Sequence, residues 1–116
     1  MDFVIGLLQW GPSLTMLLFG VSQWRHPERW TEYIPEWVIP FSFFDDKKAL
    51  MRFHALGNIV FGAFLFSTLY PLAAAWIAFL WWISILPFAF RVDWTIGMRD
   101  LSVSISLAAL IGLLMF

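Results

Sequence analysis

Long apolar runs separated by two polar stretches set the pattern of this chain. The first run extends from Phe3 to about Val21, and a second, from Phe53 to Phe90, holds 38 residues without an acidic or basic side chain apart from one histidine. A membrane span needs roughly 20 apolar residues. The second run is therefore long enough for two spans, and we expect it to fold back at Tyr70-Pro71, because proline ends one helix and suits the first turn of the next.

A last apolar run covers Leu101 to Phe116. The pattern predicts an all-α protein, an integral membrane four-helix bundle forming one domain over residues 1–116, with spans at about 3–21, 50–70, 71–90 and 101–116. The fourth span reaches only about 24 Å at ~1.5 Å per residue. We expect local thinning of the bilayer or an extra turn from residues 95–100 to make up the difference.

Composition agrees with a protein that lies in lipid. The chain is 61% hydrophobic and only 13% charged, whereas soluble domains have about 25% charged residues. The start Met1-Asp2 lacks the basic residues of a signal peptide, so the first run is interpreted as a retained helix. The absence of cysteine from this sequence excludes disulfides, thiolate catalysis and iron–sulfur ligation by its residues.

The basic residues lie on one side of the predicted bundle. All seven Lys and Arg fall between spans one and two or between spans three and four. The positive-inside rule then predicts a multi-pass protein of the cell membrane with those connections in the cytoplasm and both termini outside. Charge gives no indication of nucleic-acid binding.

The segment HPERWTEYIPEWV, residues 26–38, alternates aromatic and charged side chains. Trp30, Tyr33 and Trp37 fall on one side at helical spacing. Amphipathic aromatics of this kind lie at the level of the lipid headgroups, which predicts a short interfacial helix between spans one and two. A lid that grips a ligand is the alternative interpretation.

Small and polar residues mark the faces where helices pack in lipid. Span one carries such residues at intervals of three and four in one continuous seam, which consists of Gly6, Gln9, Ser13, Met16 and Gly20. Ala74 and Ala78 mark a packed face of span three, and we expect its tryptophans, Trp76, Trp81 and Trp82, to turn toward lipid or an interface.

Depth in the membrane predicts a polar cluster. His54 and Asn58 lie within about 8 Å of the basic end of span two, and Ser102 and Ser106 lie at a similar depth in span four. We expect these four side chains to meet, with Ser13 near the floor of the cluster. The cluster provides either hydrogen bonds that fix the bundle or a binding site for a solute or a quinone headgroup.

Arg52, Arg91 and Arg99 stand at span ends, where basic side chains bind lipid phosphate. Asp93 and Asp100 are placed to cap the following turns. No second carboxylate is placed within a span to form an acid/base pair, so we expect no catalytic residues and no metal site.

Four spans, a long first connection and a polar pair before the last span resemble the DoxX-like family of small four-helix membrane proteins. The resemblance rests on Gly20, the proline steps His26-Pro27 and Ile34-Pro35, the glycines Gly57 and Gly62, and Arg99-Asp100-Leu101. It implies a four-helix bundle and, for some members, association with quinone-linked or redox-protective membrane complexes. The chain departs from the family in lacking an acidic residue in span two and an arginine at the start of span one.

Three functions remain open from the sequence. The first is a non-catalytic helper, a small subunit of a larger membrane assembly with a membrane-protein partner or a second copy of itself, because many aromatic residues offer surface for packing and few groups offer chemistry. The second is a quinone- or lipid-binding subunit of a membrane oxidoreductase, with quinone as the one cofactor considered. The third, a small-solute transporter or channel, lacks the membrane-embedded glutamate typical of four-span drug exporters.

Overall fold

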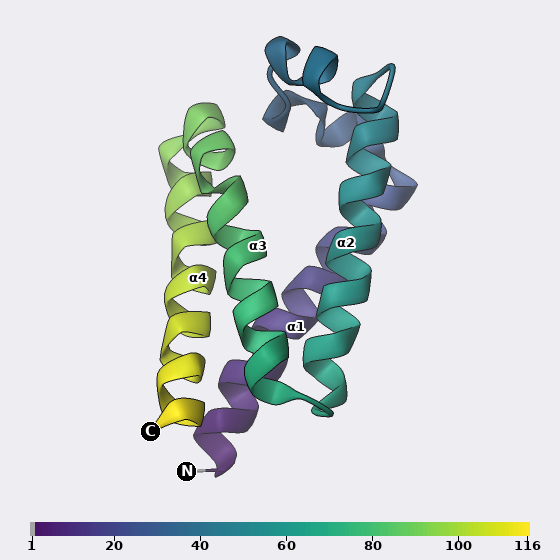
Figure 1. Cartoon of the computed structure of the whole chain (residues 1–116). Coiled ribbons are helices and arrows are strands. Elements are labelled where there is room, and N and C mark those ends of the chain that lie inside the picture. The colour runs from purple at the N-terminus through teal and green to yellow at the C-terminus, as the bar shows by residue number, and fades with distance from the viewer. Residues whose placement is uncertain (1) are drawn as a thin grey trace.

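The computed structural model describes residues 2–116, without the side chain of Asp2. These residues form four long helices, α1 (Asp2–Arg25), α2 (Lys47–Ser67), α3 (Pro71–Val92) and α4 (Trp94–Met115) (Figure 1). Each is long and apolar enough to cross a membrane. The predicted all-α, four-helix membrane bundle is confirmed, and the chain is a multi-pass membrane protein.

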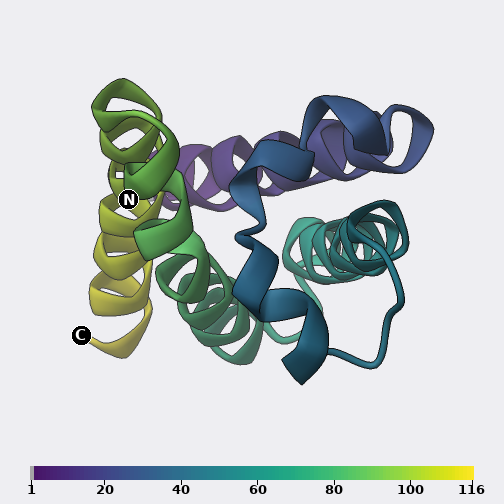
Figure 2. The same ribbon diagram turned by 90° about the horizontal axis from the view of Figure 1, so that it is seen from above.

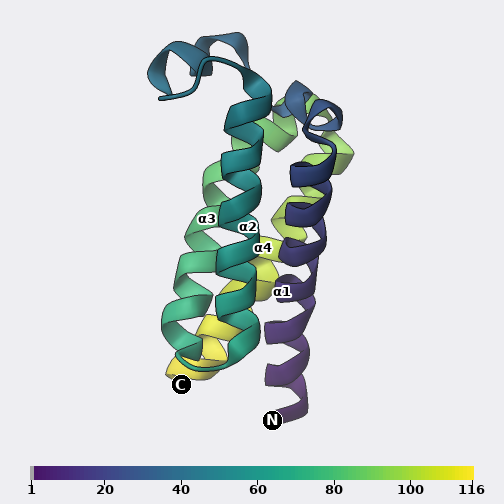
Figure 3. The ribbon, with the colours of Figure 1, turned by 90° about the vertical axis from the view of Figure 1, so that its right-hand side faces the viewer.

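The helices pack as two pairs, α1 with α2 and α3 with α4. From their connecting turn, α2 and α3 diverge toward the opposite end of the molecule (Figure 1). Both termini lie at the end of that turn, and the connection between α1 and α2 lies at the other end (Figure 3). The bundle is therefore tighter at the end that holds the termini.

Local sequence determines where α2 and α3 begin and end. Asp46 caps α2, because its carboxylate accepts a hydrogen bond from the backbone N–H of Ala49 at 2.7 Å. After Ser67 the backbone of Thr68 turns into the left-handed region, with φ 61°, which breaks the helical hydrogen-bond pattern. Pro71 then occupies the first turn of α3, where its missing N–H costs nothing.

The last span is longer than the sequence predicted. Only Asp93, with an extended backbone (φ −161°, ψ 140°), separates α3 from α4, and the 22 residues of α4 reach about 33 Å. No thinning of the bilayer is needed to accommodate it. The expected cap at Asp100 is wrong, because that residue lies in the second turn of the helix and is buried.

Between α1 and α2, residues 26–46 form a segment that we call the strap. It contains three short 3-10 turns, Pro27–Arg29, Thr31–Tyr33 and Glu36–Phe41, in place of the single interfacial helix expected. Pro35 has no N–H to donate and holds Ile34 in an extended conformation (φ −103°, ψ 110°), so a helix cannot continue through this point. The strap crosses one end of the bundle before returning to α2 (Figure 2).

The predicted seam of α1 packs against α2. Ser13 donates its hydroxyl hydrogen to the Gly62 carbonyl at 2.8 Å, and the Gln9 amide donates to the Leu65 carbonyl at 2.9 Å. Gly20 permits the closest approach, because a Cβ there would lie 2.6 Å from the Ile59 side chain and 2.9 Å from the Ala55 carbonyl oxygen. Small and polar residues thus bring the two backbones together.

The core between the pairs is apolar, and it corrects one expectation. Trp82 was expected to turn toward lipid or an interface, but it is only 1% exposed and belongs to the buried core that also contains Ala74, Ala75, Ala78 and Leu107. The alanines leave room beside α3 for a large ring. Trp76 is 41% exposed, as expected for a lipid-facing tryptophan.

We predict that Gly20→Ala destabilises the protein by about 1–3 kcal/mol, because the new methyl group overlaps α2. Gly11→Ala in the same helix is the matched control, since no atom lies within 4 Å of a Cβ at that position and alanine favours helix. Reversible unfolding in mixed micelles measures both. Equal stability of the two variants would show that α1 and α2 do not approach as closely as described.

Candidate ligand-binding site

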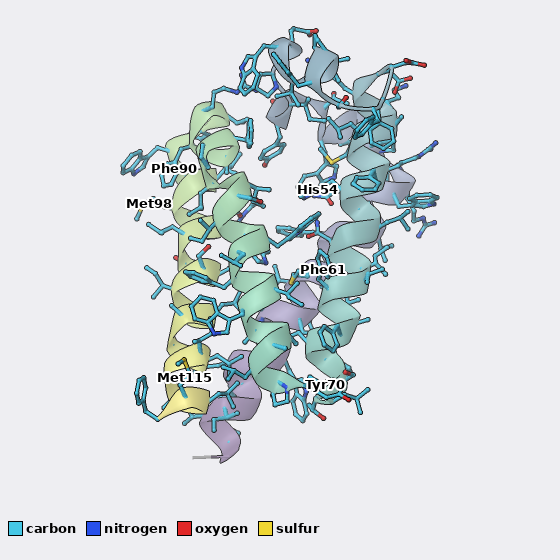
Figure 4. All side chains as sticks on the ribbon, viewed as in Figure 1. His54, Phe61, Tyr70, Phe90, Met98 and Met115 are labelled. Carbon is cyan, nitrogen blue, oxygen red and sulfur yellow. The ribbon has the colours of Figure 1, made fainter. Side chains whose placement is uncertain are left out.

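A cavity of about 180 Å³ lies beneath the strap, at the end of the bundle where α2 and α3 have diverged. His54 occupies the inner side of α2 facing this region (Figure 4). All four helices and the strap contribute to the walls. The lining residues are Phe19, Gln23, Trp30, Tyr33, Ile34, Pro35, Val38, Leu50, Met51, His54, Asn58, Trp82, Ile85, Phe88, Ala89, Arg99 and Asp100.

Asn58 joins three helices at one edge of the cavity. Its amide nitrogen donates to the Gln23 side-chain oxygen on α1 at 2.7 Å, and its amide oxygen accepts from the Trp81 indole on α3 at 2.7 Å. Asn58 and Gln23 are both buried. Because one side chain bonds α1 and α3 at the same time, it fixes the separation of the helix pairs where the cavity begins.

His54 lies one turn above Asn58 on α2. Its imidazole stacks on the Trp81 ring, with centroids 4.8 Å apart and planes 12° from parallel. Gly57 makes this possible, because a Cβ there would clash with the Trp81 ring. In the described part of the chain neither imidazole nitrogen has a hydrogen-bond partner, so the histidine can donate or accept toward the cavity.

Of the three aromatic residues predicted to lie on one side of the segment 26–38, two face inward. Trp30 and Tyr33 stack with centroids 5.6 Å apart and line the cavity, whereas Trp37 is 62% exposed. Burial raises the pKa of the Tyr33 phenol and outweighs the opposite effect of the nearby Arg99 guanidinium. Tyr33 therefore stays protonated at neutral pH and is a potential hydrogen-bond donor.

The strap is fastened on both sides of the opening between α2 and α3. Lys47 at the start of α2 pairs with Glu36 at 2.7 Å, and the Arg91 guanidinium at the end of α3 donates to the Glu32 carbonyl at 2.6 Å. Glu36 is well exposed, so its ion pair contributes little, about 0–1 kcal/mol. The strap thus covers the cavity with modest attachment at its edges, as the lid interpretation requires.

An ion pair from α4 forms part of the wall. The Arg99 Nε donates to an Asp100 carboxylate oxygen at 3.0 Å, and the Arg99 guanidinium lies 4.9 Å from the centroid of the Phe19 ring. Asp100 is only 3% exposed. Together the two charges cancel, which lowers the cost of holding them inside a membrane bundle.

Trp82 supplies an unpaired donor. It lines the cavity, and its indole Nε1 is the one sealed side-chain nitrogen or oxygen without a hydrogen-bond partner among the residues the structure describes. Leaving such a group unpaired costs about 1–3 kcal/mol. Because protein atoms seal this nitrogen, other atoms of the Trp82 ring form its part of the cavity wall.

The predicted polar cluster is corrected in part. His54 and Asn58 both line the cavity, but Ser102 and Ser106 lie on another side of α4 and bond to the carbonyls of Met98 and Ser102 within their own helix. Asp100 and Ser104 are buried instead. Residues two apart on a helix differ by about 200° in direction. The sequence argument compared the depths of these residues in the membrane but did not determine which side of α4 faces the bundle.

The remaining predicted site residues have other partners. Ser13 lies at the α1–α2 contact and its hydroxyl is already bonded to Gly62. Arg52 donates to the Trp24 carbonyl at 3.3 Å and lies over the Trp24 ring, while Arg91 holds the strap and Arg99 lines the cavity. Binding of lipid headgroups by these arginines stays a prediction.

Sequence reasoning missed Gln23, Trp81, Trp82 and Asp100. Gln23 had a signal, because it follows Gly20 by three residues and continues the seam of α1 by one more step. Asp100 was assigned to a cap because the start of α4 was placed too late. Trp82 also had a signal, because it follows Ala78 by four residues and so lies on the face of α3 that Ala74 and Ala78 mark.

Comparison with known proteins gives no match to a family model, to a curated protein sequence or to a solved structure.

We predict that Asn58→Leu destabilises the protein by about 1–3 kcal/mol, because Gln23 and Trp81 each lose a buried partner. In a double-mutant cycle with Gln23→Leu, the coupling energy should be about 0.6 kcal/mol, the typical value for hydrogen bonds between membrane helices. Ser102→Ala, which removes an exposed hydroxyl bonded within its own helix, is the control and should leave stability unchanged. Additive effects of the two substitutions would argue against the bond between α1 and α2.

Proposed function

We propose that this protein binds an apolar, ring-sized molecule in the cavity beneath the strap, and that the ligand is a quinone or a lipid with a polar group at one end. The observation that carries the proposal is the His54 imidazole, stacked on Trp81 and without a hydrogen-bond partner among the described residues, at the wall of an otherwise largely apolar cavity. Ligand sites are typically apolar hollows with a few convergent polar groups, and this cavity has that composition.

The volume of the cavity is suited to a ligand with one ring. An engineered apolar cavity of about 150 Å³ in another protein binds benzene, and the cavity here measures about 180 Å³. It therefore has room for a six-membered ring with small substituents. Aromatic walls from the strap and from α3 offer faces for stacking.

The polar groups suit carbonyl or hydroxyl oxygens. The Tyr33 phenol offers a donor, and the His54 imidazole can donate or accept. Both lie on walls of the same cavity. A quinone ring carries oxygens at opposite ends, so two walls can bond it at once. Such a site binds and orients its ligand, and electron transfer would require a redox partner.

The other two functions considered from the sequence are not tested by the structure. A helper role in a larger assembly, with a membrane protein or a second copy as partner, stays a prediction, as does transport of a small solute. Membership of the DoxX-like family is likewise proposed on the residues Gly20, Gly57, Gly62 and Arg99-Asp100-Leu101. The glycines of α1 and α2 agree with a packing role, because Cβ atoms at Gly20 and Gly62 would meet the neighbouring helix within 3.0 Å.

We predict saturable binding of a short-chain quinone, in its oxidised or reduced form, to the protein in phosphatidylcholine nanodiscs. His54→Phe keeps the stacked ring on Trp81 but removes both nitrogens, and it should weaken binding about tenfold, the equivalent of one hydrogen bond. Ser102→Ala should bind like the unaltered protein. Equilibrium dialysis against empty nanodiscs corrects for partition into lipid, and uptake equal to that of empty discs by both forms would refute the proposal.

We also propose that both termini lie outside the cell membrane, on the evidence of the basic residues at the strap end. The sequence holds no cysteine, so single cysteines report position cleanly. A membrane-impermeant thiol reagent applied to intact cells should label Tyr70→Cys and leave Asp45→Cys unlabelled until the cells are opened. Labelling of Asp45→Cys alone would reverse the orientation.

A further inference from the structure

The cavity wall carries polar groups of two kinds without a hydrogen-bond partner. The His54 imidazole can donate or accept a hydrogen bond, and neither of its nitrogens has a partner among the described residues. Asp100 can only accept while it is ionised. One of its oxygens bonds to Arg99, and its second oxygen receives no hydrogen bond from the described chain.

The second oxygen of Asp100 borders open space. The residue itself lines the cavity, and the described residues seal only Trp82 Nε1 away without a partner. An ionised carboxylate at the wall of an apolar cavity bonds strongly to any donor that reaches it, because charge-assisted hydrogen bonds are about twice as strong as neutral ones. The cavity therefore presents one donor and one strong acceptor.

Charge limits the ligand further. Arg99 and Asp100 already cancel each other at 3.0 Å. An anionic or cationic ligand would add an uncompensated charge to a site of low polarity, at a high cost. The site favours a neutral molecule.

We propose that the ligand is a neutral ring compound carrying a phenol-type hydroxyl group, whose O–H donates to Asp100 while a ligand oxygen accepts from the His54 imidazole. This inference rests on the proposed function and specifies the ligand class. A molecule with acceptor oxygens alone, such as an oxidised quinone or a ketone, leaves the carboxylate oxygen unpaired. Within the quinone class, the reduced form is the one that fits.

The test uses a matched pair of probes, a para-alkylphenol and its methyl ether, which differ in the O–H donor but share an acceptor oxygen. Binding is measured to the whole protein in phosphatidylcholine nanodiscs, corrected with empty discs. The phenol should bind about 10- to 100-fold more tightly than the ether, as expected for a hydrogen bond to a charged group. Because this ratio of affinities is measured on the unaltered protein, it does not depend on the folding of any variant.

Two variants separate the roles of the atoms. Asp100→Asn keeps an oxygen for Arg99 but turns an amide donor toward the ligand, so the preference for the phenol should fall below about threefold. His54→Phe should weaken both probes about tenfold and leave their ratio unchanged, because both retain the acceptor oxygen. Helical circular dichroism equal to that of the unaltered protein verifies that each variant is folded.

The outcomes are distinguishable. Saturable binding of both probes with equal affinity would overturn this inference while leaving the proposed function standing. A phenol preference that survives Asp100→Asn would overturn the assignment of Asp100. If neither probe, and neither form of the quinone, binds saturably, the proposed function and the inference both fail.

Discussion

The hydrogen bonds of Asn58 are the constraint on which the rest of the structure depends. A carboxamide can donate and accept at once, and here it donates to Gln23 of α1 and accepts from the Trp81 indole of α3. In a bilayer, apolar side chains gain little by leaving lipid for a helix interface, so polar bonds and close packing decide how helices associate. Below Asn58, glycine and serine bring α1 and α2 together. Above it, α2 and α3 diverge and the cavity opens.

This division of the bundle explains why a membrane protein with so few polar residues buries several of them in one region. The strap-end half contains the ion pair of Arg99 and Asp100, the stacked His54 and the Asn58 amide, all at the walls of one cavity. For a bundle that needed only stability, apolar side chains would fill this volume at lower cost. Polar groups retained at an unfilled space are better explained by a molecule that binds them. The strap closes the space with aromatic rings and weak attachments.

The sequence predicted the features that depend on the thickness of the membrane or on the repeat of the α-helix. The thickness of the hydrocarbon layer limits charge-free runs, so the number of spans and the turn near Tyr70-Pro71 could be predicted. Spacings of three and four identified the packed face of α1, because glycine and polar residues stand out there against apolar neighbours. The same reasoning failed for α4, where depth selected Ser102 although rotation buries Asp100. It failed for Trp82 because the size of the ring was given more weight than its position, four residues after Ala78 on the face that the alanines mark. Rotation about a helix axis is determined by the partner helices and is not contained in one helix alone.

The most direct measurement is a high-resolution structure of the protein purified in its native lipids. The account predicts density from a ring-sized molecule in the cavity beneath the strap, with one oxygen within about 3.2 Å of a His54 imidazole nitrogen, the range of a hydrogen bond. A cavity closed by side chains, with the His54 nitrogens bonded to the protein itself, would contradict it.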